Sequence, residues 1–394
     1  MREKIIAYAD SQAAVYRRIA LEIHAKPEVS NYEFFACQWL SDQMKAEGFD
    51  VQVDVAGHRT GFTATYKSKK PGPVLVFLAE YDALVGLGHG CGHNLFGPTS
   101  CLAAAALKQV IDQAGGEVRL YGTPGEEGGE NGAAKASFVR EGLLKDVDAA
   151  LCVHPGDKHI ATTRTLACAP VDIEFWGKPS HAASAPEQGI NALDALILTY
   201  NGINALRQHV TDDVRMHGII TSGGQAPNIV PEYAAGKFFL RAATAPGLEN
   251  VYQRVEQIVA GAAAMTGARG RMQPSQNRVE NTILTPAFDA VYAREIAGFG
   301  IALGVSDSKV GIGSSDVGNI SQVVPTIQPT ICITDGPTPW HSEASKAASC
   351  SEKGLASIAL GAKALAMTAL DLILEPELLQ AIRAEHARNV AAQG

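Results

Sequence analysis

A chain of 394 residues is too long for one ordinary hydrophobic core, and this length predicts about two domains. With 46% hydrophobic and 19% charged residues, the chain has the composition of a folded globular protein rather than a disordered one. Its net charge of −8, without a long basic run, argues against nucleic acid or an anionic membrane surface as the main partner.

The cysteines and the N-terminus indicate a cellular compartment. The seven cysteines show no paired spacing, which is typical of free thiols in a reducing environment. The first residues lack the apolar segment of a signal peptide, and no run approaches the roughly 18 uncharged apolar residues of a membrane span. We therefore expect a cytoplasmic protein with no membrane partner.

The first part of the chain alternates between strand and helix patterns, which predicts a mostly parallel sheet flanked by helices. In chain order, we expect helices at 5–23 and 32–47, a hairpin of 51–55 and 60–66, a strand at 74–80, a helix at 98–113 with Pro98 in its first turn, a strand at 117–122, a helix to about 142 and a strand at 149–153.

The pattern then changes to a self-contained unit. Strands at 171–177, 216–222, 233–242 and 270–279 alternate with helices at 191–208 and 248–266, and this βαββαβ order predicts a ferredoxin-like domain. The first pattern resumes with a helix at 286–303, short strands at 309–313 and 330–334, and a helix at 351–374. We expect a catalytic domain of 1–167 and 284–394, with a domain of 168–283 inserted into it.

Residues that can bind a metal follow four of the predicted strands. They are Cys91 and His93, Glu127, His154, and His341. Because sites in an open α/β sheet form at the carboxyl ends of strands, the four loops can meet at one place. A mixed set of sulfur, nitrogen and carboxylate donors suits one or two transition-metal ions such as zinc or manganese.

Each motif also has a simpler interpretation when it is taken alone. Cys91 and His93 lie in a glycine-rich turn, which could carry a cysteine incidentally. Glu126 and Glu127 could form a solvated acidic turn. In the functional interpretation, one carboxylate binds the metal and the other stays free as the general base, and a nearby dication keeps both ionised. The coincidence of four such loops favours the metal site.

Several motifs together resemble the co-catalytic metal amidohydrolases of the aminoacylase type. This family includes the auxin-conjugate hydrolases, p-aminobenzoyl-glutamate hydrolase and β-alanyl-lysine dipeptidase, and the last two form the branch that this chain resembles most. The resemblance covers nearly the whole chain and rests on the stretches at 82–84, 90–94, 122–129, 154–155, 177–182, 227–231, 313–318 and 341–342.

The resemblance implies a role for each matching residue in the metal site. Cys91 would bridge two divalent ions, and Glu126 would be the general base. Asp82 would orient a ligand without binding the metal itself. The remaining ligands would be His93, Glu127, His154 and His341.

The resemblance also implies that the inserted domain mediates dimerisation and serves as a lid. His181 would reach the site of the partner subunit and stabilise the oxyanion. Asn228 and Arg241 would hold the carboxylate of the substrate, a task that suits the planar fork of arginine. The alternative for Arg241 is a surface residue at a strand end.

We therefore predict a homodimeric two-metal amidohydrolase that cleaves N-acyl amino acids or dipeptides with a free carboxylate. Two alternatives stay open at this point. A catalytically silent homologue could bind metal and regulate another protein. A thiol enzyme could use Cys91 as nucleophile and His93 as base, but it would leave the other ligand-type residues unexplained.

Overall fold

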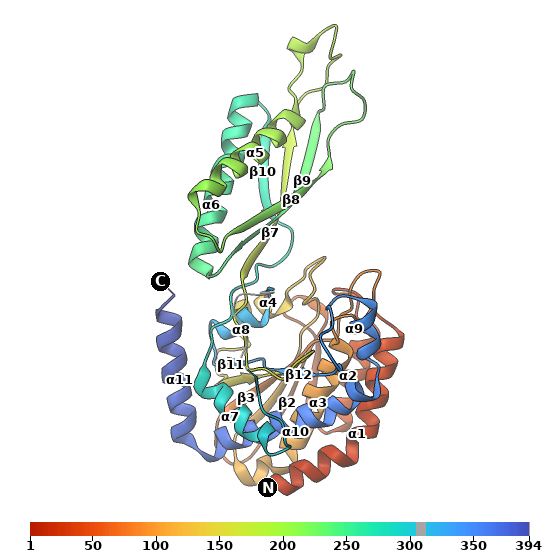
Figure 1. Ribbon diagram of the computed structural model, residues 1–394, viewed down its shortest axis with the longest axis vertical. Helices are drawn as coiled ribbons and strands as arrows, with labels where there is room; N and C mark the ends of the chain where they lie inside the picture. Colours follow the sequence, from red (N-terminus) through yellow and green to blue (C-terminus); the bar gives the residue numbers. More distant parts are fainter. Residues whose placement is uncertain (305–312, 394) are drawn as a thin grey trace. The chain divides into compact units, whose positions relative to one another are not determined.

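The computed structural model describes residues 1–304 and 313–393. These residues form two compact units (Figure 1). Unit 1 comprises Met1–Arg164 and Thr282–Ala392, and unit 2 comprises Thr165–Asn281. The division expected from the sequence was 1–167, 168–283 and 284–394. The strand expected at 309–313 lies outside the described residues, except for its last position.

A six-stranded sheet forms the centre of unit 1, in the order β1-β2-β4-β3-β5-β11. Strands β4, β3, β5 and β11 are parallel, and the hairpin β1–β2 adds two antiparallel strands at one edge. The prediction of a mostly parallel sheet is confirmed. The strands are β1 Asp50–Val55, β2 His58–Lys67, β3 Val74–Ala79, β4 Glu117–Gly122, β5 Ala149–Leu151 and β11 Thr326–Ile327.

Helices cover both faces of this sheet, so its central strands are apolar on both sides. In β3, Leu75 and Phe77 join the main core, whereas Val76 and Leu78 join a smaller core on the other face. This division follows from the two-residue period of a strand. The helices of unit 1 are α1 Arg2–Ala25, α2 Phe34–Ala46, α3 His93–Ala114, α4 Ala134–Arg140, α7 Pro286–Ala297, α8 Val317–Ser321, α9 Glu343–Ala348, α10 Glu352–Leu374 and α11 Pro376–Ala391.

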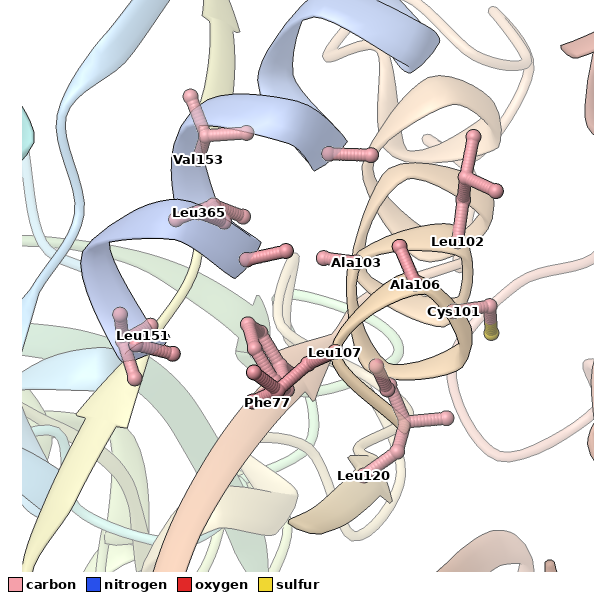
Figure 2. Packing of buried hydrophobic residues seen from close by; sticks show 14 of the residues in the cluster. Phe77, Cys101, Leu102, Ala103, Ala106, Leu107, Leu120, Leu151, Val153 and Leu365 are labelled. Carbon is pink, nitrogen blue, oxygen red and sulfur yellow. The ribbon is translucent and has the colours of Figure 1, made fainter. Parts of the chain in front are cut away.

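Small side chains let α3 and α10 pack closely over the sheet. Figure 2 shows Ala103 and Ala106 of α3 near Leu365 of α10, with Phe77 of β3 beneath the two helices. All four side chains are fully buried. By length and hydropathy α10 could span a membrane, but 78% of its most apolar window is buried inside the protein, as in a core helix.

Unit 2 contains one antiparallel sheet in the order β10-β7-β9-β8. Helices α5 and α6 lie side by side over one face of the sheet (Figure 1). The predicted ferredoxin-like βαββαβ unit is confirmed. Its elements are β7 Ala167–Trp176, α5 Ala192–Leu206, β8 Arg215–Ser222, β9 Tyr233–Ala242, α6 Ala245–Thr266 and β10 Arg269–Pro274.

Some local predictions were wrong. Pro98 lies inside α3 rather than in its first turn, because the helix already begins at His93. Strand β12, Thr330–Cys332, does not join the main sheet but pairs with β6, His154–Gly156, in a separate two-stranded sheet. Helices α8, α9 and α11 were not predicted. Two of them are shorter than two turns, so they carry little periodic signal.

Candidate metal centre and catalytic site

The loop after β3 places two ligand-type side chains on either side of a glycine. Cys91 and His93 flank Gly92, which has φ +82°. A Cβ at this position would lie 2.9 Å from the ring of Pro155, so a larger residue would meet both backbone strain and a steric clash. His93 is then the first residue of α3 and is fully buried. The backbone turn at Gly92 therefore fixes the positions of the Cα atoms of Cys91 and His93.

The five ligand-type residues form two triads that share Cys91. One triad consists of Cys91, His93 and His154, and the other of Cys91, Glu127 and His341, with the donor atoms of each triad within 4.8 Å of one another. His154 begins β6, and His341 precedes α9. The structure thus brings four separate loops together around one thiol.

Asp82 links the two triads. Its Oδ1 lies 3.0 Å from His93 Nδ1, and its Oδ2 accepts the backbone N–H of Glu127 at 2.9 Å. The backbone carbonyl of Asp82 also lies 3.1 Å from His93 Nδ1. Because that nitrogen faces only acceptors, it carries the hydrogen, and the lone pair of Nε2 is directed away from Asp82. One carboxylate therefore orients a ligand of each triad.

The donor set fits a pair of divalent cations. Cys91 Sγ and His154 Nε2 are 3.6 Å apart, and His341 Nε2 and Glu127 Oε1 are 3.4 Å apart. Two ligands of one tetrahedral zinc ion would be about 3.3–3.6 Å apart, from the usual zinc–donor bond lengths. Among the described residues, the buried atoms His93 Nε2 and Glu127 Oε1 have no hydrogen-bond partner. A cation in each triad would satisfy them.

His341 has an unusual backbone conformation. Its φ is +57°, a region that residues other than glycine rarely adopt and that costs about 1–3 kcal/mol. Its N–H bonds to the carbonyl of Gly90 at 3.4 Å, and the adjacent Ser342 caps α9. In this conformation His341 Nε2 lies 3.4 Å from Glu127 Oε1, the separation of two ligands of one ion.

Glu126 belongs to neither triad but lies beside them. Its Oε2 is 4.0 Å from His93 Nε2. Burial and the charges of Glu80 and Glu127 raise the pKa of Glu126 well above its usual range. In contrast, although burial opposes ionisation, His341 and His93 lower the pKa of Glu127 to about 2. The two adjacent carboxyl groups thus differ in proton affinity, as a base and a ligand should.

The N-terminal segment holds the turn that carries Glu126. Glu33 is fully buried. Its Oε1 accepts a hydrogen bond from the N–H of Gly125 at 2.9 Å, and its Oε2 accepts one from the hydroxyl of Thr60 at 2.9 Å. Asn31 Nδ2 donates to the carbonyls of Glu130 and Asn131 at 2.8 and 2.9 Å. Both ends of the loop are therefore anchored to residues about 100 positions away. This role was not predicted from the sequence.

A buried lysine is the second feature that was not predicted from the sequence. Lys135 Nζ lies 2.5 Å from Asp316 Oδ1 and 2.9 Å from Glu80 Oε1, and all three side chains are fully buried. The Lys135 N–H also donates to Asp316 Oδ2 at 3.1 Å. Although burial acts to lower it, the charges of Asp316 and Glu80 raise the pKa of Lys135. The one hint of a buried lysine in the sequence was its partner Glu80, a carboxylate at the end of an apolar strand, two residues before Asp82.

The predicted oxyanion residue His181 and the predicted substrate-binding residues Asn228 and Arg241 lie in unit 2, at opposite ends of its sheet. His181 and Asn228 adjoin, because Ala182 N donates to Asn228 O at 3.0 Å and His181 bridges to Ile229. Arg241 lies near the far end of β9, eight residues beyond Tyr233, or about 26 Å along a strand. In the strand pairing it lies opposite Arg215 of β8.

Backbone contacts determine the tautomer of His181. Its Nδ1 accepts the N–H groups of Ala183 and Ser184, each at 3.2 Å. A nitrogen that accepts cannot carry the hydrogen, so Nε2 is the protonated donor of the neutral ring. His181 can therefore donate a hydrogen bond to an oxyanion without first gaining a proton.

Known proteins are similar to this chain both in its inserted domain and over nearly its whole length. Residues 168–265 match the model of the M20 peptidase dimerisation domain. Over 392 residues the chain is 32% identical to Xaa-Arg dipeptidase of Homo sapiens, covering 95% of this chain and 89% of the relative. Over 272 residues it is 40% identical to a p-aminobenzoyl-glutamate hydrolase subunit of Escherichia coli, covering 64% of this chain and 56% of that one.

Solved structures share the fold. An aminobenzoyl-glutamate utilization protein of Klebsiella pneumoniae superimposes with a TM-score of 0.73 at 22% identity, covering 93% of this chain and 98% of the other. A dinuclear metal binding peptidase of Bacillus subtilis superimposes with a TM-score of 0.63 at 18% identity, covering 92% and 99%. At these identities the likeness concerns the fold alone.

Proposed function

Because the chain belongs to the M20 family of metal-dependent amidohydrolases and peptidases, we propose that it hydrolyses the amide bond between an acyl group and an amino acid with a free carboxylate. Named relatives act on Xaa-Arg dipeptides, p-aminobenzoyl-glutamate and indole-3-acetyl-aspartic acid. The observation that carries the proposal is the pair of triads joined at Cys91, with Glu126 left free beside them.

We propose two divalent ions per chain, zinc or manganese. Cys91, His93 and His154 would hold one ion, and Cys91, Glu127 and His341 the other. When bound, such ions act as Lewis acids on the scissile carbonyl and on water. The mixed donor set is compatible with either metal.

Glu126 moves the proton in the proposed reaction. It takes a proton from the attacking water as the oxygen of that water bonds to the carbonyl carbon. It then delivers the proton to the nitrogen of the leaving amine as the C–N bond breaks, so the carboxylate is regenerated. Burial raises the pKa of Glu126, which strengthens it as a base toward the attacking water.

Two copies of the chain would complete one site. His181 would donate Nε2–H to the oxyanion, and Arg241 would bind the carboxylate of the substrate. The separation of the two residues along the sheet of unit 2 supports a site in which His181 and Asn228 come from the partner subunit. Strand β8 supports pairing through unit 2, since it is an edge strand on which Ile219 and Ile220 are exposed.

Chelation followed by reconstitution tests the proposal. The enzyme should lose hydrolysis of N-acyl amino acids when its metal is removed and regain it with zinc or manganese. Full activity after chelation would favour a thiol enzyme that uses Cys91. A protein that binds metal but hydrolyses none of the N-acyl amino acids or dipeptides would be a silent homologue. We also propose a cytoplasmic location, because all seven cysteines are free thiols.

A further inference from the structure

Two buried carboxylates hold the turn of Glu126 and Glu127 at two separate points. Glu33 Oε1 accepts a hydrogen bond from the N–H of Gly125, the residue before Glu126, at 2.9 Å. Asp82 Oδ2 accepts one from the N–H of Glu127, the residue after it, also at 2.9 Å. Both carboxylates are buried. Different partners therefore hold the backbone on the two sides of Glu126.

Gly125 is the point at which Glu33 can act on the turn. Its carbonyl accepts the N–H groups of Ala133 at 2.7 Å and of Gly128 at 3.3 Å, so this oxygen is held by the turn itself. Its N–H is held from outside the turn, by Glu33. A buried N–H that loses its acceptor is unfavourable, so the backbone would shift to find another partner. Such a shift changes the direction of the Glu126 side chain.

Glu33 is itself held in place by the central sheet. Its Oε2 accepts a hydrogen bond from the hydroxyl of Thr60, a residue of β2, at 2.9 Å. The carbonyl of Thr60 accepts one from the hydroxyl of Tyr81, which follows β3, at 2.5 Å. All three side chains are fully buried. An acceptor held in this way has little freedom to move, so it fixes the position of the Gly125 N–H.

We propose that Glu33 is a positioning residue for the general base: through the N–H of Gly125 it sets the direction of the Glu126 carboxylate, while Asp82 separately serves the ligand Glu127. The inference rests on the proposed function, because it gives Glu33 a part in the proton transfer by Glu126. A displacement of about 1 Å in a reacting group can lower the rate about 100-fold. Loss of the Glu33 contact should therefore lower kcat and leave the metal bound.

Glu33→Gln and Glu33→Met form a matched pair, because both side chains are uncharged and similar in length, and only glutamine keeps an oxygen for the Gly125 N–H. Burial and the charge of Asp82 raise the pKa of Glu33 to about 8, so glutamine also resembles the protonated acid. With the N-acyl amino acid or dipeptide that wild type hydrolyses fastest, Glu33→Met should lower kcat about 10- to 100-fold, with KM and metal content unchanged. Glu33→Gln should keep most of the wild-type kcat.

Thr60→Val is the control for damage to the buried network. It removes the other hydrogen bond of Glu33 and leaves the contact with Gly125 in place. This variant should be less stable than wild type in a urea titration, with kcat near that of wild type. An equal loss of kcat in Glu33→Met, Glu33→Gln and Thr60→Val would come from general destabilisation and would overturn the proposal.

A double substitution tests whether Glu33 acts through Glu126. In Glu126→Gln enzyme, which has already lost the base, adding Glu33→Met should lower the residual kcat no further. A second loss as large as the first would mean that Glu33 acts by another route, and would overturn the proposal. If Glu33→Met does not fold, Glu33→Asp serves in its place, because its shorter side chain moves the acceptor away from Gly125. Metal-dependent hydrolysis at the wild-type kcat in the Glu33 variant refutes the inference and leaves the proposed function intact. Activity that needs no metal refutes the proposed function itself.

Discussion

Asp82→Asn separates orientation of the ligands from binding of the metal. The carboxylate accepts from His93 Nδ1 with one oxygen and from the N–H of Glu127 with the other. Asparagine has only one side-chain oxygen, so in either orientation its NH2 group must face one of these two N–H donors. We expect the fold to persist and one ligand to lose its orientation.

The expected magnitude follows from one lost charge-assisted hydrogen bond. Such a bond contributes about 1.5–3 kcal/mol, which corresponds to about 10- to 150-fold in metal affinity. This agrees with the roughly 10- to 100-fold effect of changing the partner of a metal-bound histidine.

Competition with a chromophoric chelator measures the metal affinity of wild type and variant. Asp289→Asn is the control for replacing a buried carboxylate that belongs to neither triad, because both hydrogen bonds that Asp289 accepts come from Thr162 and reach the same oxygen, which asparagine keeps. It should leave metal affinity unchanged. If Asp82→Asn binds zinc or manganese as tightly as wild type, the orienting role is wrong. An equal loss in the control would mean that the effect comes from general destabilisation.

Further changes test the other proposed roles. Glu126→Gln should keep its metal and lower kcat by about 10²- to 10⁴-fold, whereas Glu127→Gln should lose metal, and swapped phenotypes in kinetics and metal analysis would reverse the two assignments. Mixing inactive His181→Ala chains with inactive Glu126→Gln chains should restore activity, because one site of each hybrid dimer carries neither substitution. If the chains exchange and activity does not recover, His181 does not act in the partner's site. A contact of about 2–4 kcal/mol between the Arg241 guanidinium and the substrate carboxylate predicts that wild type prefers free acids over amides by at least about 30-fold. Arg241→Ala should erase this preference. Equal cleavage of both substrates by wild type would contradict the carboxylate-binding role of Arg241. Ala106→Leu should lower the free energy of unfolding by about 1–3 kcal/mol, because the fully buried Ala106 between α3 and α10 leaves no room for a larger side chain. An unchanged urea midpoint of unfolding would show that this packing is loose.

Local chemistry explains what the sequence predicted well. A short, continuous apolar run marks a buried strand such as β3, and the ligand-type residues stand in the loops that follow the predicted strands. Glu126 and Glu127 were recognisable because two adjacent carboxylates on a glycine-rich turn need a positive partner. These signals lie within a few residues of one another, so no knowledge of the fold is needed to read them.

Helix boundaries depend on both local and distant residues. Pro98 indicated a helix start, but α3 begins five residues earlier at His93, where Gly92 turns the chain closely against Pro155. The position of His154 likewise depends on β6 pairing with β12, which is about 175 residues away. A proline inside a helix is tolerated when tertiary packing outweighs the lost hydrogen bond.

The sequence by itself determined which residue types could bind a metal and the strands that they follow. The tertiary structure alone decided how they are grouped: Cys91 shared by two triads, and Asp82 serving a ligand of each. It also decided that Lys135, a lysine on a short helix that would ordinarily be solvated, is buried between Glu80 and Asp316. The physical reason is that the charge state and direction of a buried polar group depend on its partners, and these partners lie 55 and 181 positions away along the chain.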